Sequence, residues 1–154
     1  MTLAPRDTDH DNSATVLTRL QDLYANFSLE TVAQLHGVYA ADIEFIDPIH
    51  RVQGLPKLER YLAKMARNLA HYQLRYTDLL AGDGQACLRW EMDFAHPRIK
   101  AGQIITISGM THLRFHDKIY RHEDCYDLGS MLYEHLPVLG AVIKLIKKHM
   151  ARQD

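Results

Sequence analysis

The feature that most constrains the fold is a run of long alternating strands in the second half of the chain. Apolar and polar residues alternate between residues 72 and 127, and turns rich in Gly and Asp interrupt the run. We expect strands at 72–80, 85–95, 104–115 and 119–127, with a Gly82-Asp83-Gly84 turn between the first two. Because short turns join antiparallel neighbours, this pattern predicts a meander of long antiparallel strands.

Helical periodicity precedes these strands. Ser13 is placed to cap a first helix, whose apolar residues recur at three- and four-residue steps: Val16, Leu20, Leu23, Tyr24 and Phe27. Ser28 predicts a second, shorter helix that extends to Tyr39, after which residues 43–46 have the period of a strand. A third helix is expected after Gly54.

Helices followed by a run of antiparallel strands define the α+β class. We expect three N-terminal helices to cover one face of a cone-shaped, curved antiparallel or mixed sheet, with an extra C-terminal helix after Pro137. Such a sheet and its helices leave a space that can form a pocket. Residues 1–12 lack apolar periodicity and are expected to form a frayed tail.

Composition limits the classes of function. The chain has 154 residues and a formal net charge of −1, which fits one domain and disfavours nucleic acid as a partner. The two cysteines, Cys87 and Cys125, predict reduced, buried thiols in a cytoplasmic protein. The ten histidines form no helical metal-binding pair with a supporting acid, and no Gly-rich loop opens a helix after a strand, so neither a metal nor another cofactor is expected.

Two stretches resemble a known superfamily. The residues YAADIEFIDP at 39–48, followed by GLPKLERYL at 54–62, resemble the nuclear transport factor 2-like superfamily and its SnoaL-like group, which includes ketosteroid isomerases and limonene-epoxide hydrolases. The resemblance implies a SnoaL-like domain at 13–128, with a C-terminal helical extension at 129–154. A pocket for a small lipophilic molecule, such as a steroid, polyketide or terpene-like compound, and a homodimer are expected.

The resemblance also implies catalytic residues. Asp47 corresponds to the general base of the isomerases, and Tyr24 lies near their oxyanion-binding tyrosine. Asp124 corresponds to the water-activating aspartate of the epoxide hydrolases, and Asp93 to their second aspartate. The chain departs from both patterns, because Glu91 stands where the hydrolases need an arginine. The strand at 104–115 offers Ser108, Thr111 and His112 where the isomerases have a further aspartate.

Alternation places Tyr120, His122, Asp124 and Tyr126 on one face of the last strand, and the resemblance implies that this face lines the pocket. The alternative is a polar outer face or a dimer contact. On the strand at 85–95, either the face of Trp90 or that of Asp93 points inward. If the Trp90 face does, Asp93 leaves the site and the ligand is lipophilic.

Two of these candidates also have a purely structural explanation. Asp47 precedes a proline, where a carboxylate can simply cap nearby amides. Tyr24 lies on the apolar stripe of its helix, which is typical of a core residue. His50 follows Asp47 closely and could orient or receive a proton.

Two functions follow from these residues. The first is cofactor-independent acid–base catalysis, of isomerase or hydrolase type, by Asp47, Asp124, His122 and Asp93, with Tyr24, His50, Trp90, His112 and Tyr126 contacting the ligand. The second is a non-catalytic ligand-binding or protein-interaction dimer. The C-terminal helix at 138–152 has apolar residues on one side and lysines on others, which suits a membrane surface or a partner. The interpretation favoured by the sequence is that it packs on its own or a neighbouring subunit.

Overall fold

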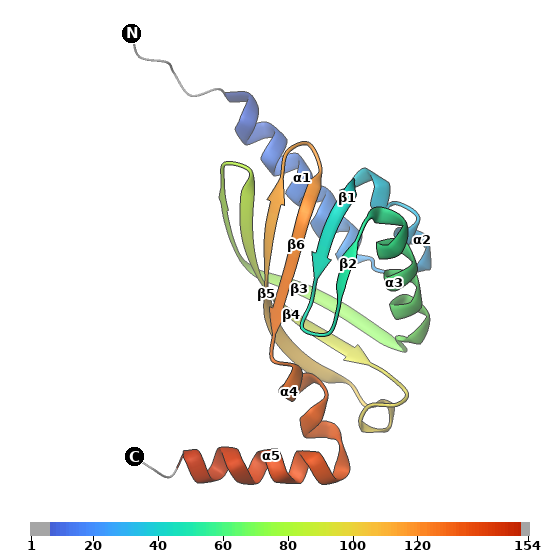
Figure 1. The fold of residues 1–154 in the computed structure, drawn as a ribbon, viewed down its shortest axis with the longest axis vertical. Coiled ribbons are helices and arrows are strands. Elements are labelled where there is room, and N and C mark those ends of the chain that lie inside the picture. Colours follow the sequence, from blue (N-terminus) through green and yellow to red (C-terminus); the bar gives the residue numbers. More distant parts are fainter. Residues whose placement is uncertain (1–6, 152–154) are drawn as a thin grey trace.

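A single six-stranded sheet organises the molecule in the computed structural model, which describes residues 7–151 (Figure 1). The strands are β1 (Tyr39–Ile46), β2 (Arg51–Gln53), β3 (His71–Gly82), β4 (Gln85–Ala95), β5 (Ile105–Phe115) and β6 (Ile119–Tyr126). The helices are α1 (Asp7–Ala25), α2 (Leu29–Val32), α3 (Leu55–Asn68), α4 (Leu128–Met131) and α5 (Pro137–Met150), with short 3-10 turns at Leu35–Gly37, Lys100–Gly102 and Tyr133–His135.

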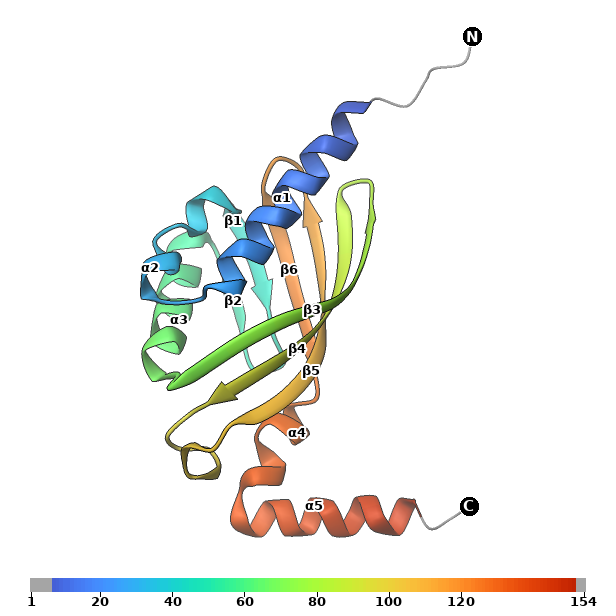
Figure 2. The same cartoon turned by 180° about the vertical axis from the view of Figure 1, so that it is seen from behind.

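The sheet is mixed and strongly curved. Its strand order is β2-β1-β6-β5-β4-β3, in which β1 and β6 are parallel and all other neighbours antiparallel. Helix α1 crosses one face of the sheet, and α3 packs on β1 and β2 (Figure 2). The predicted α+β cone with three N-terminal helices and a C-terminal helix is therefore confirmed.

Apolar residues from helices and strands meet on the concave side of the sheet. One buried cluster joins Leu20 of α1 and Leu58 and Leu62 of α3 to residues of the sheet such as Leu88 and Leu113. A second cluster contains Trp90, Phe94, Ile105 and Ile107. The Trp90 face of β4 therefore points inward, which settles the alternative that alternation left open.

The helix boundaries differ from the prediction in two places. Helix α1 begins at Asp7, six residues before Ser13. Residues 1–6 of the predicted tail lie outside the described residues. Ser28 caps α2 as predicted, in a reciprocal capping box with Thr31, but this helix ends at Val32 and Tyr39 begins β1.

A bulge in β6 changes the predicted face of this strand. Phe115 pairs with Ile119 and Arg114 pairs with Arg121, so Tyr120 is one extra residue in β6. Consequently Ile119 and His122 are both buried, and the ring of Tyr120 stacks on His116 instead of joining His122. The prediction that Tyr120 shares a face with His122, Asp124 and Tyr126 is wrong.

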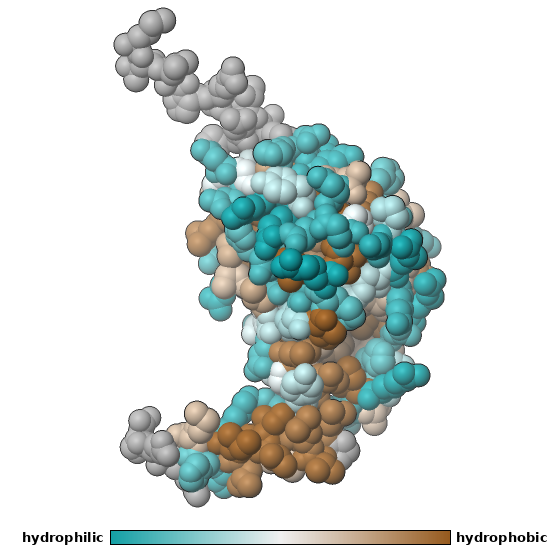
Figure 3. All heavy atoms as spheres, viewed as in Figure 1, coloured by the Kyte–Doolittle hydropathy of each residue, from teal (hydrophilic) through white to brown (hydrophobic). Residues whose placement is uncertain are grey.

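The expectation of two buried thiols is wrong. Both cysteines are free thiols, but Cys125 is exposed and Cys87 is half-buried, because both belong to the outer face of the sheet. Helix α5 stands away from the rest of the domain and exposes most of its apolar side chains (Figures 1 and 3), so it does not pack them on its own subunit. Packing of this helix on a neighbouring subunit stays a prediction. None of the helices within residues 7–151 combines the length and apolarity needed to cross a membrane.

Candidate functional site

A cavity of about 90 Å³ lies between the concave face of the sheet and helices α1 and α3. Most of its lining is apolar or aromatic, and its charged side chains are Asp47 and Asp124, beside His122. The lining residues are Tyr24, Phe27, Phe45, Asp47, Leu62, Met65, Tyr72, Leu74, Tyr76, Trp90, Met92, Thr111, His122, Asp124 and Tyr126. Several of them, such as Met65, Met92 and Tyr126, are only half-buried, so the cavity is not sealed from solvent.

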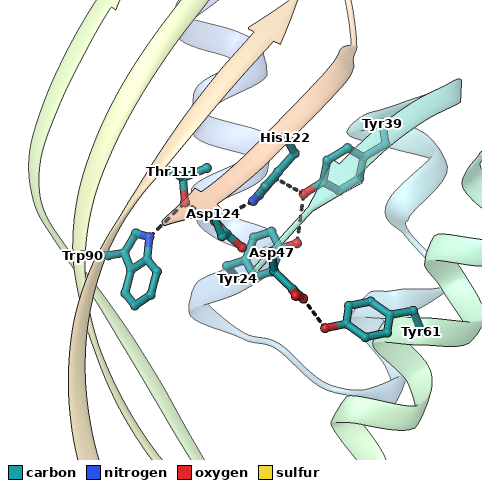
Figure 4. Close-up of polar contacts among 8 residues, drawn as sticks. All are labelled: Tyr24, Tyr39, Asp47, Tyr61, Trp90, Thr111, His122 and Asp124. Carbon is teal, nitrogen blue, oxygen red and sulfur yellow. Dashed lines mark hydrogen bonds and ion pairs between the residues drawn. The ribbon is translucent and has the colours of Figure 1, made fainter. Parts of the chain in front are cut away.

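Asp124 is held from two sides at one carboxylate oxygen. The Trp90 indole donates to Thr111 Oγ1 at 2.9 Å, and the Thr111 hydroxyl donates to Asp124 Oδ1 at 2.5 Å. His122 Nε2 lies 2.9 Å from the same oxygen (Figure 4). Among the described residues every donor to Asp124 reaches Oδ1, which leaves Oδ2 free to accept a hydrogen from a bound molecule.

A chain of hydroxyls continues behind His122. Tyr39 OH lies 2.9 Å from His122 Nδ1, and Tyr24 OH lies 2.9 Å from Tyr39 OH. All these groups are satisfied when His122 carries its proton on Nε2, Tyr39 donates to Nδ1 and Tyr24 donates to Tyr39. Burial raises the pKa of Tyr24 and Tyr39 well above the ordinary value for tyrosine, so both phenols keep their protons at neutral pH.

Asp47 is both the predicted cap and a lining residue of the cavity. Its Oδ1 accepts hydrogen bonds from the backbone amides of Ile49 and His50, each at 2.7 Å. Its Oδ2 accepts a short hydrogen bond from the Tyr61 hydroxyl on α3 (Figure 4). Burial, followed by the contact with Asp47, raises the pKa of Tyr61, so this phenol stays protonated as a donor. Both oxygens of Asp47 therefore already have donors from the protein.

The two carboxylates act on the same part of the cavity. Burial is the largest cause that raises the pKa of Tyr126 and the pKa of Tyr61. The negative charges of Asp47 and Asp124 raise both pKa values further. Burial and the charge of Asp124 likewise raise the pKa of Tyr76. Tyr126 and Tyr76 are thus neutral hydroxyl donors near Asp124, and no described residue forms a hydrogen bond with either hydroxyl.

The structure brings together most of the residues predicted for the site. Those that line the cavity are Asp47, Asp124, His122, Tyr24, Trp90 and Tyr126. His50 lies just outside, with Nδ1 3.7 Å from Asp47 Oδ1 and its ring against that of Tyr61. His112 does not line the cavity, because its neighbour Thr111 occupies the inward position on β5.

Asp93 lies outside the cavity, so the structure does not bring this predicted catalytic residue to the site. Because Trp90 and Phe94 point inward, Asp93 is on the outer face of β4. There its Oδ2 lies 2.6 Å from Arg75 Nη1, and its Oδ1 accepts from the Thr106 hydroxyl at 2.6 Å. Arg75 and then Thr106 lower the pKa of Asp93 to about 2.

This shift predicts a change in acid stability. An aspartate whose pKa is lower in the folded chain stabilises the fold above its unfolded pKa of about 3.9, and that contribution is lost as the pH falls toward the folded value. We expect Asp93→Asn to lower the free energy of unfolding at neutral pH and to flatten its fall below about pH 4 by a similar amount, both modest because the ion pair is partly exposed. Urea titrations at several pH values measure it, with Asp83→Asn in the β3–β4 turn as the control. Equal acid slopes for wild type and Asp93→Asn would contradict the assignment.

Several residues of the site were not among the predicted ones, including Tyr39, Tyr61, Tyr76 and Thr111. The sequence pattern predicts a helix at Tyr39, but this residue begins β1. Tyr61 precedes Leu62 on α3 and is not one of the apolar residues that recur at three- and four-residue steps along this helix. Thr111 shares its face of β5 with the buried residues Ile107 and Leu113, and this alternation was a readable signal. No group of three or more metal-ligating side chains occurs within the described part of the chain.

The curved sheet and the polar groups in its cavity define an α+β cone with an internal site. A family model for the SnoaL-like domain matches residues 20–122. The chain therefore belongs to the SnoaL-like domain family, of the nuclear transport factor 2-like fold, which confirms the resemblance found in the sequence.

Solved structures share this fold at low sequence identity. An NTF2-like protein of unknown function from Burkholderia pseudomallei is 13% identical, with a TM-score of 0.66 over 78% of this chain and 94% of that one. A putative SnoaL-like polyketide cyclase from a Jannaschia species is 11% identical, with a TM-score of 0.65 over 84% and 94% of the two chains. A putative hydroxylase from Streptomyces galilaeus is 17% identical, with a TM-score of 0.64 over 84% and 98%. A search of curated proteins gave no match.

Proposed function

We propose that the chain binds a small lipophilic molecule with a polar edge and moves a proton on it, using Asp124 as the base and no cofactor. The observation that carries this proposal is the environment of Asp124. One carboxylate oxygen is fixed by Thr111 and His122, the other has no donor from the described residues, and Asp124 lines a largely apolar cavity. A carboxylate oriented in this way can serve as a general base.

Asp124 suits this role better than Asp47, to which the resemblance gives the role of general base. Three donors already occupy both oxygens of Asp47, so a substrate would have to displace one of them. We therefore assign Asp47 to shaping the cavity and to holding Tyr61 at its edge.

The tyrosines supply the complementary group. Abstraction of a proton next to a carbonyl leaves negative charge on the carbonyl oxygen, and a neutral donor aimed at that oxygen lowers the barrier. Tyr126 is a protonated phenol near Asp124, and we assign it to this oxygen. In the proposed step, the C–H proton passes to Asp124 Oδ2, the C–H electron pair forms a carbon–carbon double bond, and the π pair of the carbonyl moves to the oxygen held by Tyr126. Exchange is complete when Asp124 returns a solvent-derived proton to the same carbon. In an enone, return of the proton to the γ carbon of the conjugated dienolate completes an isomerisation.

The lining of the cavity supports a compact cyclic substrate, and the size of the cavity limits how much of such a ring it can enclose. The walls are mainly aromatic and aliphatic, and about 90 Å³ is less than the ~150 Å³ of an apolar cavity known to hold benzene. A ring as large as benzene would therefore have to extend toward the half-buried lining residues Met65, Met92 and Tyr126. One solved structure of the same fold is a putative SnoaL-like polyketide cyclase, which is consistent with a cyclic substrate.

Trp90 gives a direct test of binding, because it is the only tryptophan and it lines the cavity. We expect small cyclic enones to change its fluorescence at saturable concentrations, and we expect the protein to accelerate exchange of their α-protons for solvent deuterium in proton NMR. Saturable binding without exchange would support the alternative of a non-catalytic ligand-binding domain. Neither binding nor exchange across a panel of such ketones would refute the proposed substrate class.

A further inference from the structure

The C-terminal helix α5 has an apolar side that the domain leaves uncovered. Val138 is 80% exposed, and Leu145 and Met150 are each 69% exposed. Val142 and Ile146 are also exposed, and together these residues recur at three- and four-residue steps along the helix. Figure 3 shows hydrophobic surface gathered over α5.

The contacts that hold α5 keep this side turned outward. A Cβ atom on Gly140 would lie 2.3 Å from the Glu134 carbonyl oxygen, so the helix meets the preceding turn at its smallest residue. Lys147 forms an ion pair with the Glu134 side chain. Gly140 and Lys147 lie on the side of the helix opposite Val142 and Leu145. The polar side is therefore fixed toward the domain, and the apolar side is exposed.

The charge of α5 is of one sign. Lys144, Lys147 and Lys148 lie on the polar side, and the segment 137–150 contains no acidic residue. A helix with a broad apolar side and lysines on the other is the pattern of helices that lie in the interface of a membrane. The helix also forms one end of the molecule and runs across its long axis, so a flat surface can approach it without meeting the sheet (Figure 1).

We propose that α5 docks on an anionic lipid surface, lying flat with Val138, Val142, Leu145 and Ile146 among the acyl chains and its lysines near the headgroups. Charge complementarity favours this partner over a second copy of the chain, because pairing two α5 helices would bring together segments of the same positive charge. The proposal is independent of the chemistry in the cavity.

Sedimentation of the full chain with lipid vesicles tests this. We expect binding to phosphatidylcholine vesicles that contain phosphatidylglycerol, about tenfold or more weaker binding to phosphatidylcholine alone, and weakening with salt. Ile146→Glu should abolish binding. Leu80→Glu is the matched control, because Leu80 is 70% exposed on β3, far along the chain from α5, and this variant should bind like the wild type.

A second pair of variants separates charge from hydrophobicity. Lys144→Gln with Lys148→Gln removes two charges but retains the Lys147–Glu134 contact, so the helix stays docked, and binding to the anionic vesicles should fall about tenfold or more. Equal binding by wild type and Ile146→Glu would overturn the proposal. So would a dimer, seen by analytical ultracentrifugation, that Ile146→Glu dissociates while no vesicles are bound, because the occupant would then be a second copy.

Discussion

Asp124→Asn is expected to slow α-proton exchange by about 10²–10⁴-fold, the usual contribution of a positioned general base. The asparagine carbonyl can still accept the hydrogen bonds from Thr111 and His122, so the fold and ligand binding should change little. Exchange rates from proton NMR, together with the Trp90 fluorescence titration, measure the two effects separately. Loss of rate with unchanged affinity is the signature of a group that acts in the chemical step.

Asp47→Asn is the matched control for this substitution. It removes the other carboxylate of the cavity, but its carbonyl can still accept from the two loop amides. We expect less than about a tenfold fall in the exchange rate, which is below the effect of losing a general base. A larger loss for Asp47→Asn than for Asp124→Asn would identify Asp47 as the base, as the resemblance of the sequence implies.

Gly109→Ala is expected to lower the free energy of unfolding by about 1–3 kcal/mol, as overpacking of a filled core does. A Cβ atom at this position would lie 2.4 Å from two atoms of the Trp90 ring and 2.9 Å from the Cys125 carbonyl oxygen. Trp90 cannot retreat freely because its indole is bonded to Thr111. The substitution should therefore also shift the emission of Trp90. Urea unfolding and fluorescence measure the two effects.

Gly82→Ala controls for the change of residue type. A Cβ atom on Gly82 would meet nothing within 4 Å, and alanine normally reduces the entropy of the unfolded chain. The control should be neutral or slightly stabilising. If Gly109→Ala were as stable as Gly82→Ala, the tight contact between Trp90 and β5 would be contradicted.

Local pattern predicted most of the elements of this fold. The strand β4 has the predicted bounds, and the turn after Gly82 joins β3 and β4 as expected. Alternation on β4 identified two faces but could not say which was inward, because that depends on which side of the sheet the helices cover. Once Trp90 and Phe94 are inward, Asp93 must be outward. Tyr39 was misassigned because it continues the helical spacing of Leu35 and Val38.

The candidate site was predicted in part, because its residues are distant in sequence. Asp124 and His122 are neighbours on one strand, and the sequence could identify both. The contact between Tyr39 and His122 spans 83 residues, and it depends on the parallel pairing of β1 with β6. The bulge at Tyr120, which separates this residue from the inward face of His122 and Asp124, appears only in the register of β6 against β5. Local patterns do not encode these long-range features.

A crystal structure of the protein soaked with a small cyclic enone tests the central claim most directly. The account predicts that the ring occupies the cavity beside Trp90, with its carbonyl oxygen within hydrogen-bonding distance of the Tyr126 hydroxyl and a proton-bearing carbon facing Asp124 Oδ2. A cavity closed by its own side chains, or an enone bound with its ring away from Asp124, would contradict the account.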